Sequence, residues 1–498
     1  MADPLFLGLD VGTSGVKAIL VAASGEVRAS ALTPLTMSTP RPGWAEQDPA
    51  AWWDATVASI HAVRRARPHA VVGAIGISGQ MHSSVFLDRS GRVIRPALLW
   101  CDGRTTEECA EITAAVGGED RLRDLACNPA LEGFTLPKVL WLRKHEPESY
   151  ARVATVLLPK DYIRYRLTGV LATDPSDASA TLMYDTAHNR WSDEILAAVN
   201  VPRAIVPDVG GSAEVLGTVS AEAAALTALP KGTPVVGGGA DNACGAAGVG
   251  AMTPGEVVSS WGTSGTVLAP VSEPRVDPGL RAHTFCHVAP NSWYMMGVVL
   301  SAGGAFSWYR EQFAREASDA KEGARILDAE AASIHPGAGG VTFLPYLQGE
   351  RTPHRDAAAR GAFLGLSLAH TRAHMSRAVL EGVCFALRDS LTILQDLGLS
   401  PSHLLLTGGG ARSALLRQLQ SEVFGLPVTT VNREEGPAYG AALLAAVGAG
   451  AFPDIASAGR ATLTRARLEH PDPAAHAQYD APYARYRQAV RAARPDLL

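Results

Sequence analysis

Near its start the chain reads Leu5-Phe6-Leu7-Gly8-Leu9-Asp10-Val11-Gly12-Thr13-Ser14-Gly15-Val16-Lys17-Ala18-Ile19-Leu20-Val21-Ala22, two apolar runs joined by a glycine-rich turn. A further turn at Ser24-Gly25 leads to a third apolar run at 27–32. Short apolar runs separated by tight turns are typical of strands that pair with their neighbours in sequence. The segment therefore predicts an antiparallel meander of three strands.

Helices and a buried strand are expected after the meander. Residues 51–66 carry apolar side chains at helical spacing, and helical stretches also occur at 105–116 and 162–167. Residues 71–77 form a continuous apolar run, which suits a strand covered on both faces. Strands mixed with helices in this way indicate an α/β domain.

The same pattern returns in the second half of the chain. Apolar runs near 256–259 and 293–299 flank a second glycine-rich turn, and 404–407 runs into glycines followed by a helical stretch at 413–423. Spacing supports an internal duplication better than residue identity does. We expect two similar α/β units, with the boundary near 245–255.

Bulk composition excludes several classes of protein. The chain has 498 residues, 47% hydrophobic and 19% charged, and a net charge of -5, which gives no electrostatic reason to expect nucleic acid or an anionic membrane as partner. No apolar run approaches the roughly 18 residues needed to span a bilayer, and the first ten residues lack the basic start of a signal peptide. The six cysteines are scattered singly. Reduced thiols and a cytoplasmic location are therefore expected.

The turn at residues 10–15 suits phosphate binding. Its backbone N–H groups and the hydroxyls of Thr13 and Ser14 can converge on one concavity, where Lys17 would add a positive charge. Asp10 could hold Mg²⁺, directly or through water. A plain β-hairpin turn is the alternative, but a second Gly-Thr-Ser-Gly at 262–265 favours two phosphate turns facing each other across a cleft. No P-loop sequence is present, and no Rossmann fingerprint follows the first strand.

Two further glycine-rich segments are candidates for ligand contact. Gly408-Gly409-Gly410-Ala411 joins a strand to a helix, where it either admits a flat ligand such as adenine or only makes a tight junction. Asp241 follows three glycines and an alanine, and its carboxylate could accept the proton of an alcohol during phosphoryl transfer. A helix N-cap explains Asp241 equally well from the local sequence.

These residues resemble the FGGY family of carbohydrate kinases from Phe6 to Leu444. Its first signature matches 133–145, and its second matches 361–366 with His374-Met375 and 378–381 beyond it. Within the family the chain is similar to the xylulokinases in the following segments: 44–49, Trp52-Trp53, 79–82, 158–162 and 349–354. The resemblance implies two duplicated ribonuclease H-like domains of the actin/Hsp70 ATPase type with a central cleft.

The resemblance also implies roles for particular residues. Asp241 would be the proton acceptor, and Asp10 would be needed for activity and for Mg²⁺. The sugar would contact Met81, His82, Trp100, Asp102, Arg104, Asp241 and Asn242. ATP would contact Gly12, Thr13, Ser14, Lys17, Thr263, Gly303, Ser307, Gly410 and Ala411, although Gly303 could equally be a packing residue.

Domain limits, substrate and partners follow from the same resemblance. Residues 1–246 would form the domain that carries the sugar site and the base, and 247–498 the nucleotide-binding domain. We expect ATP-dependent phosphorylation of a ketopentose such as D-xylulose, possible homodimers, and no nucleic acid or membrane partner. The alternatives are a kinase of another ketose or polyol, such as ribulose, a chaperone-like nucleotide-binding protein, and a sugar-binding module without catalysis.

Overall fold

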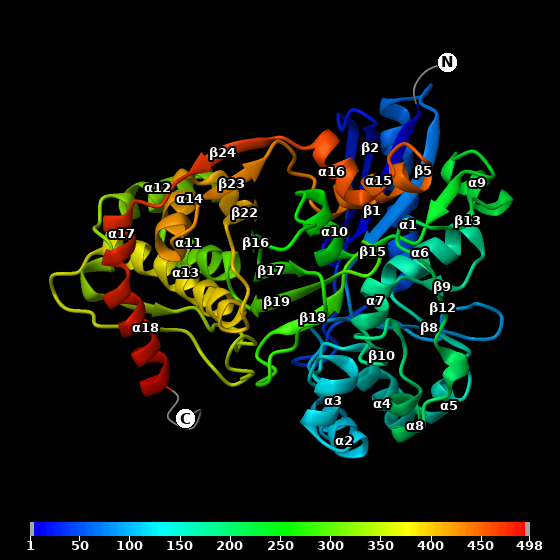
Figure 1. The fold of residues 1–498 in the computed structure, drawn as a ribbon, viewed down its shortest axis with the longest axis horizontal. Helices are drawn as coiled ribbons and strands as arrows, with labels where there is room; N and C mark the ends of the chain where they lie inside the picture. Colours follow the sequence, from blue (N-terminus) through cyan, green and yellow to red (C-terminus); the bar gives the residue numbers. More distant parts are fainter. Residues whose placement is uncertain (1–3, 494–498) are drawn as a thin grey trace.

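The computed structural model describes residues 4–493, so the predicted domain limits at Met1 and Leu498 lie outside the described residues. Each half of the chain builds one seven-stranded sheet (Figure 1). The first sheet contains β1 (Leu5–Val11), β2 (Gly15–Ala22), β3 (Val27–Pro34), β5 (Val72–Gly79), β13 (Val215–Thr218), β14 (Pro234–Val236) and β15 (Gly239–Ala240). The second contains β16 (Glu256–Trp261), β17 (Gly265–Val271), β18 (His283–Cys286), β19 (Trp293–Val299), β22 (His403–Gly408), β23 (Val428–Val431) and β24 (Arg465–Glu469).

The two sheets share one topology. The order β14-β5-β1-β2-β3 in the first sheet recurs as β23-β22-β16-β17-β19 in the second. The pairs β1–β2 and β16–β17 are antiparallel, whereas β1–β5 and β16–β22 are parallel. The predicted duplication of an α/β unit is therefore confirmed, as is the opening meander.

Helices of the first half cover the first sheet and build the lower lobe on the right of Figure 1. They are α1 (Pro49–Ala66), α2 (Thr106–Val116), α3 (Glu119–Ala126), α4 (Thr135–His145), α5 (Pro147–Tyr150), α6 (Pro159–Thr168), α7 (Pro175–Ser179), α8 (Asp193–Ala198), α9 (Ala221–Thr227) and α10 (Asp241–Gly248). Helix α6 begins three residues before the predicted stretch because Pro159 stands at its first position, where a missing N–H costs nothing.

Most helices of the second half pack around the second sheet. The helices of this half are α11 (Gly303–Phe313), α12 (Ala320–Ala332), α13 (Arg372–Asp396), α14 (Ala414–Phe424), α15 (Pro437–Gly448), α16 (Ile455–Thr462), α17 (Pro473–Gln478) and α18 (Asp480–Ala493). Five two-stranded sheets complete the fold: β4 (Glu46–Gln47) with β7 (Ala97–Leu98), β6 (Val85–Leu87) with β8 (Thr155–Leu157), β9 (Ala172–Thr173) with β12 (Asp208–Val209), β10 (Tyr184–Asp185) with β11 (Arg190–Trp191), and β20 (Thr342–Leu344) with β21 (Ala362–Leu364).

Helix α15 ties the two halves together. It follows the second sheet in sequence but packs on β1 and β5 of the first. A Cβ on Gly8 would lie 2.1 Å from the Ala438 carbonyl oxygen, and one on Gly76 would lie 1.9 Å from that of Ala441. The helix can approach the sheet this closely only because both strand positions are glycine.

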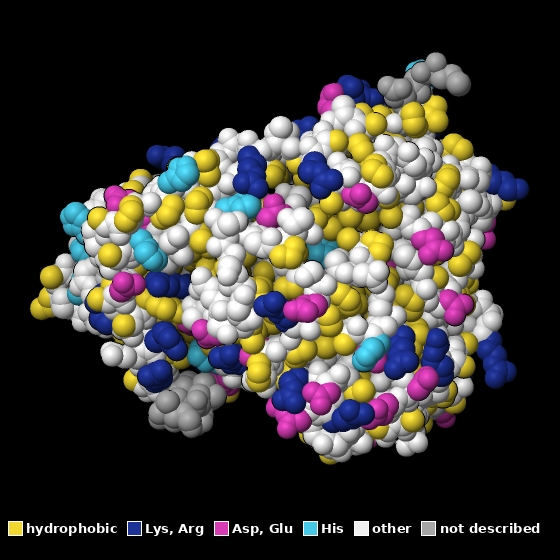
Figure 2. Space-filling view, viewed as in Figure 1, with side chains coloured by type: hydrophobic (Ala, Val, Ile, Leu, Met, Phe, Trp, Pro, Cys, Tyr) yellow, Lys and Arg dark blue, Asp and Glu magenta, His cyan; other side chains and the backbone are white. Residues whose placement is uncertain are grey.

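One buried apolar cluster contains side chains from both halves, among them Met81, Phe134, Phe285 and Tyr294. On the face shown in Figure 2, hydrophobic side chains are visible between the two halves, whereas charged side chains are scattered over the outer surface. Within residues 4–493 no helix is long and apolar enough to cross a membrane.

Candidate active site

The predicted base Asp241 stands where β15 ends and α10 begins. Gly238 has φ +75°, and a Cβ there would lie 2.0 Å from the Ile77 carbonyl oxygen, so the chain can pass this close to β5 only as glycine. Ala240 is the N-cap of α10, and Asp241 is the first residue of the helix. The alternative that Asp241 serves as the N-cap is therefore wrong.

The Asp241 side chain is half-buried and lies beside a second acid. Its Oδ1 accepts hydrogen bonds from the backbone N–H of Asn242 at 2.8 Å and from Asn242 Nδ2 at 3.1 Å. Burial and then the negative charge of Asp10 raise the pKa of Asp241 to about 7. Burial likewise raises the pKa of Asp10 to about 6, against the opposing charge of Lys17. The two acids therefore lie within each other's field at the ends of neighbouring elements.

Asp10 fits a role at a divalent cation. Its Oδ1 is buried without a hydrogen-bond partner among the described residues, which is costly unless another group satisfies it. No cluster of three or more His, Cys, Asp or Glu side chains with metal-site geometry exists within residues 4–493. Mg²⁺ characteristically takes one or two carboxylates and completes its shell with water and phosphate oxygens, so the donor set suits it.

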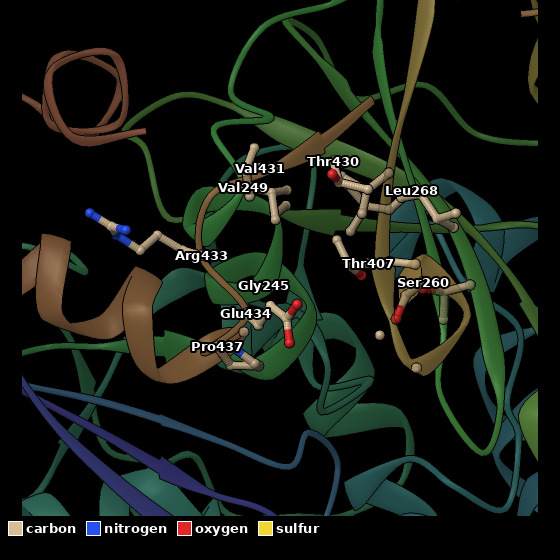
Figure 3. A pocket seen from close by; sticks show the side chains of 18 of the residues that line it. Gly245, Val249, Ser260, Leu268, Thr407, Thr430, Val431, Arg433, Glu434 and Pro437 are labelled. Atoms are coloured by element: carbon tan, nitrogen blue, oxygen red, sulfur yellow. The ribbon is translucent and has the colours of Figure 1, made fainter. Parts of the chain in front are cut away.

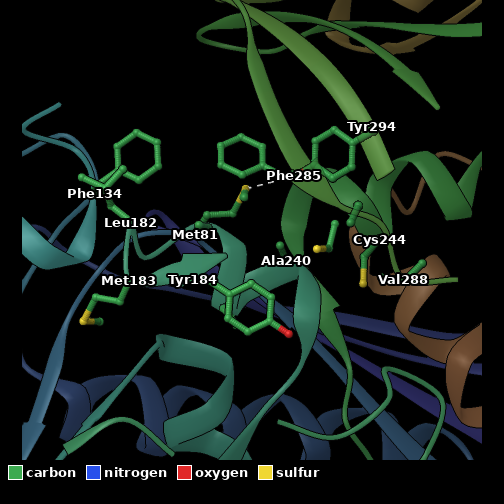
Figure 4. Packing of buried hydrophobic residues seen from close by; sticks show 14 of the residues in the cluster. Met81, Phe134, Leu182, Met183, Tyr184, Ala240, Cys244, Phe285, Val288 and Tyr294 are labelled. Atoms are coloured by element: carbon green, nitrogen blue, oxygen red, sulfur yellow. Dashed lines mark hydrogen bonds between the residues drawn. The ribbon is translucent and has the colours of Figure 1, made fainter. Parts of the chain in front are cut away.

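Met81 and His82 follow β5 and lie beside Asn242. The Asn242 Nδ2 donates to Met81 Sδ at 3.3 Å, and Tyr294 Oη approaches the same sulfur at 3.8 Å from the second half of the chain (Figure 4). His82 Nδ1 donates to the Ala180 carbonyl at 2.6 Å. Burial lowers the pKa of His82 to about 3, so the ring is neutral and Nε2 keeps a lone pair that can accept a hydroxyl hydrogen.

The segment of Trp100, Asp102 and Arg104 forms a wall next to the first turn. Trp100 Nε1 donates to Thr13 Oγ1 at 3.0 Å. Asp102 accepts the Ala45 N–H at 2.6 Å and pairs with Arg104 at 2.7 Å, and both side chains are almost fully buried. These bonds would have to break before either charge reached a sugar, so the geometry favours a supporting role. Direct contact of the pair with substrate stays a prediction.

The first glycine-rich turn is held by polar contacts. Thr13 Oγ1 donates to Gln80 Oε1 at 3.0 Å, and the Gly12 N–H donates to the Gly15 carbonyl at 3.1 Å. Lys17 Nζ donates to the Glu435 carbonyl at 3.4 Å, so it joins this turn to the loop before α15. Ser14 at the tip is exposed.

The second glycine-rich turn rests on the start of α11. The Thr263 carbonyl accepts the N–H groups of Ala302 at 3.0 Å and Gly304 at 2.9 Å. A Cβ on Gly303 would lie 2.4 Å from the Gly262 carbonyl oxygen. Gly303 is thus a packing residue that lets the helix approach the turn, and Ser307 lies partly buried one turn further along α11.

A cavity of about 610 Å³ extends from Asp241 and Asn242 to the turn after β22. Ala411 lines it, but Gly410 lies behind it, where a Cβ would be 2.8 Å from the Trp261 side chain. In Figure 3, Glu434 and Pro437 lie on one side of the space, Ser260 and Thr407 lie on the other, and Arg433 points away. Of the predicted site residues, only Asp241, Asn242 and Ala411 line this cavity.

Part of the cavity wall carries no sequence motif that predicts it. Residues 430–434 and Gly436 contribute to the lining, although they carry no glycine-rich turn or paired signature of the kind that marked the other segments. The all-round apolar helix that follows was the available signal, because such a helix must be buried and brings the preceding loop inward.

Two sheets of one topology, with Asp10 near the end of β1 and Asp241 directly after β15 beside a cavity, form a duplicated α/β fold of the actin/Hsp70 ATPase type. Models of the FGGY family of carbohydrate kinases match residues 5–248 with their N-terminal domain and 257–449 with their C-terminal domain. The chain belongs to this family, and it is an enzyme that transfers a phosphoryl group to a carbohydrate hydroxyl.

Curated relatives extend over most of the chain. It is 43% identical to a xylulose kinase of Klebsiella pneumoniae over 89% of this chain and 90% of the relative. A xylulose kinase of Bacillus subtilis is 40% identical over 90% and 89%, respectively. The crystal structure of a xylulose kinase from Rhodospirillum rubrum superposes with a TM-score of 0.90 and 34% identity, covering 99% of both chains.

Proposed function

We propose that this enzyme phosphorylates D-xylulose with ATP to give D-xylulose 5-phosphate. The observation that carries the proposal is the position of Asp241, a half-buried carboxyl with its pKa raised to about 7 that lies beside Asn242 and at the end of the cavity. The two curated xylulose kinases named above, at 40% and 43% identity over about 90% of the chain, support the choice of sugar.

Asp241 in its ionised form would accept the proton of the reacting hydroxyl and hold its oxygen in line with the phosphoryl group. Loss of that proton late in the reaction makes positioning the larger part of the contribution. His82 Nε2 would accept a hydrogen bond from a second sugar hydroxyl, because its Nδ1 is already committed to Ala180. Asn242 would fix the Asp241 carboxyl through the two bonds to Oδ1.

The cavity between Asp241 and the turn after β22 would take the nucleotide, with its phosphates toward Asp241 and its base toward Ala411. Thr13 and Thr263, with the amides of their turns, would bind phosphate oxygens. Asp10 would hold Mg²⁺, which supplies charge neutralisation at the transferred phosphate when bound. The assignment of Gly12, Ser14, Lys17 and Ser307 to the nucleotide stays a prediction, as do the homodimer and the cytoplasmic location.

The proposal is tested by measuring ADP release with a coupled assay over D-xylulose, ribulose, other ketoses and glycerol. We expect kcat/KM to be highest for D-xylulose. A higher value for ribulose or a polyol would overturn the choice of sugar while leaving the carbohydrate kinase intact.

Asp241→Ala tests the base. Sugar phosphorylation should fall by at least about a hundredfold, since general base catalysis typically contributes that much or more. ATP binding, measured by calorimetry, should stay near that of the wild type because the cavity beyond Asp241 is unchanged. Near-normal turnover in the variant would overturn the assignment.

A further inference from the structure

The short segment Asp174–Ala180, which contains α7, contacts both ends of the proposed sugar site. At its C-terminal end, the Ala180 carbonyl accepts the His82 Nδ1 hydrogen at 2.6 Å. At its other end, Ser176 Oγ accepts the backbone N–H of Ala240 at 2.9 Å, immediately before Asp241. One piece of backbone thus lies against the proposed sugar ligand His82 and the proposed base.

Ser176 is itself fixed by a buried acid. Its Oγ donates to Asp174 Oδ2 at 2.6 Å, and Ser212 Oγ donates to the same oxygen at 2.8 Å. Asp174 also caps α7 by accepting the N–H groups of Ser176 and Asp177. The Ser176 hydroxyl therefore has one orientation in which both its donor and its acceptor functions are satisfied.

A buried charge network holds Asp174 from behind. Lys160 Nζ lies 2.9 Å from Asp174, 2.6 Å from Asp161 and 3.1 Å from Asp177, and each of these side chains is 0% exposed. Arg164 adds a contact of 3.1 Å to Asp161. Burying ions costs several kcal/mol each, and an apolar replacement of a whole buried network is often at least as stable. A contribution to folding stability alone therefore does not explain why these five ionisable side chains are buried next to α7.

The segment also touches the second half of the chain. Ser179 Oγ accepts the Cys286 N–H at 3.1 Å, and Cys286 belongs to β18 of the second sheet. The Asp174–Ala180 segment therefore has fixed contacts to His82, to Ala240 and to the opposite domain, while Lys160 holds it from the core of the first.

We propose that Asp174–Ala180, held by Lys160, is a positioning bracket that sets the spacing between His82 and Asp241 and thereby the sugar that fits between them. The inference rests on the proposed function, because it takes His82 as a sugar ligand and Asp241 as the base. Ser176 and Asp174 touch neither sugar nor nucleotide. They act through the backbone of Ala240, so they are positioning residues.

Ser176→Ala removes the link to Ala240 and leaves the rest of the bracket. The KM for the ketopentose should rise at least about fivefold and kcat should fall about tenfold, since small displacements of reacting groups are costly. The KM for ATP should change less than about twofold, because the cavity lining does not include the bracket. Ser176→Thr keeps the hydroxyl and should restore most of the loss.

Ser192→Ala is the matched control. Ser192 is a buried serine of the same domain that caps α8 by accepting the Ile195 N–H at 3.2 Å, and it has no contact with the bracket. If a substitution only reduced the fraction of folded enzyme, the active fraction would fall, but the KM for the ketopentose and the KM for ATP would stay unchanged. This holds for Ser176→Ala and for Ser192→Ala. Equal behaviour of Ser176→Ala and Ser192→Ala, or an equal rise of both KM values in Ser176→Ala, would overturn the bracket.

A second variant covers the case in which Ser176→Ala does not fold. Ser212→Ala removes only the outer bond to Asp174, and it should shift the sugar KM in the same direction by a smaller factor; an unchanged sugar KM would count against the bracket. Failure of the proposed function looks different, because it appears in the wild type before any substitution, as a higher kcat/KM for ribulose or a polyol than for D-xylulose or as no phosphorylation of any ketose.

Discussion

Asp241 and Asp10 are two carboxyls of the candidate active site whose pKa values lie above the ordinary value of 3.8. Loss of solvation raises the pKa of both carboxyls, and the negative charge of Asp10 raises the pKa of Asp241 further. Lys17 offsets part of this for Asp10. Binding of a cation or of a hydrogen-bond donor beside these carboxyls would make their ionisation less costly. In the free enzyme, the cost of ionising them lowers the free energy of unfolding.

The raised pKa of Asp241 predicts that the free energy of unfolding depends on pH. Between the ordinary value of 3.8 and about 7, the unfolded chain has lost the Asp241 proton while the folded chain keeps it. Unfolding then releases a proton, so the free energy of unfolding falls as pH rises through this window. The fall is at most about 1.4 kcal/mol per pH unit. Asp241→Asn removes the effect. Its stability advantage over the wild type should grow between pH 4 and pH 7 and then level off, in urea melts with EDTA present.

Asp10→Asn provides the companion measurement. Its advantage should grow in the same direction but level off near pH 6, because the pKa of Asp10 is raised to about 6. If the difference in free energy of unfolding between wild type and variant stayed constant from pH 4 to pH 7 for both variants, the raised pKa values of Asp10 and Asp241 would be contradicted.

Individual site residues could be predicted only where a signature surrounds them. The local sequence at Asp241 suits a base and a helix cap equally well, and only the resemblance to the family predicts the base. Asp102 and Arg104 carry the same kind of signature, yet the structure pairs them with each other, because a sequence motif does not say which way a charge points. The Ser176 link joins residues 64 positions apart, and no local pattern records it.

At the scale of elements, the contact of α15 with β1 and β5 joins the two halves more closely than any other helix-to-sheet contact between them. Glycines at both strand positions admit carbonyl oxygens of the helix at distances no side chain would allow. Gly440 plays the reciprocal part on the helix, since a Cβ there would lie 2.0 Å from the Cys244 carbonyl oxygen of α10. The N-terminus of α10 carries Asp241, so the helix packing supports the site.

Gly76→Ala should therefore be strongly destabilising. The new Cβ would lie 1.9 Å from the Ala441 carbonyl oxygen, and backbone atoms must move to admit it. Overpacking of this kind typically costs about 1–3 kcal/mol, and we expect the upper end in a urea melt. Gly459→Ala is the control, because its Cβ would meet only ordinary contacts at 3.6 Å within α16, where alanine favours the helix. A smaller loss for Gly76→Ala than for Gly459→Ala would show that α15 does not sit tightly on the sheet.

The elements themselves were largely predictable, and their partners were not. The meander, the helix at 51–66 and the buried strand at 71–77 follow from periodicity, because each buries its apolar side chains locally or against its neighbours. The contact of α15 with the first sheet could not be predicted. Its small residues are apolar on every face, which predicts that the helix is buried but not which element it packs against.

At the scale of the whole molecule, buried polar contacts join the halves at a second place, far from α15. Asn128 Nδ2 donates to the Thr284 carbonyl at 2.7 Å, and Asn128 Oδ1 accepts the His283 Nδ1 hydrogen at 2.9 Å. Asn128 follows α3 in the first domain, and His283 and Thr284 belong to β18 of the second. One buried apolar cluster is also shared between the halves, in addition to a cluster within each half.

This arrangement predicts one cooperative unfolding transition for the wild type and a divided one for Asn128→Ala. The substitution leaves the Thr284 carbonyl and the His283 N–H buried without their partner, and each such group costs about 1–3 kcal/mol. The loss falls on the contact between domains, so the melting curve should broaden or split in calorimetry while each half keeps its own sheet. Arg121→Ala, which breaks an exposed ion pair within the first domain at 2.5 Å, should lower stability by less than about 1 kcal/mol and leave a single transition. If the wild type already showed two unfolding transitions, the shared apolar cluster would not couple the unfolding of the two domains. The proposed role of the α15 and β18 contacts in that coupling would then be wrong.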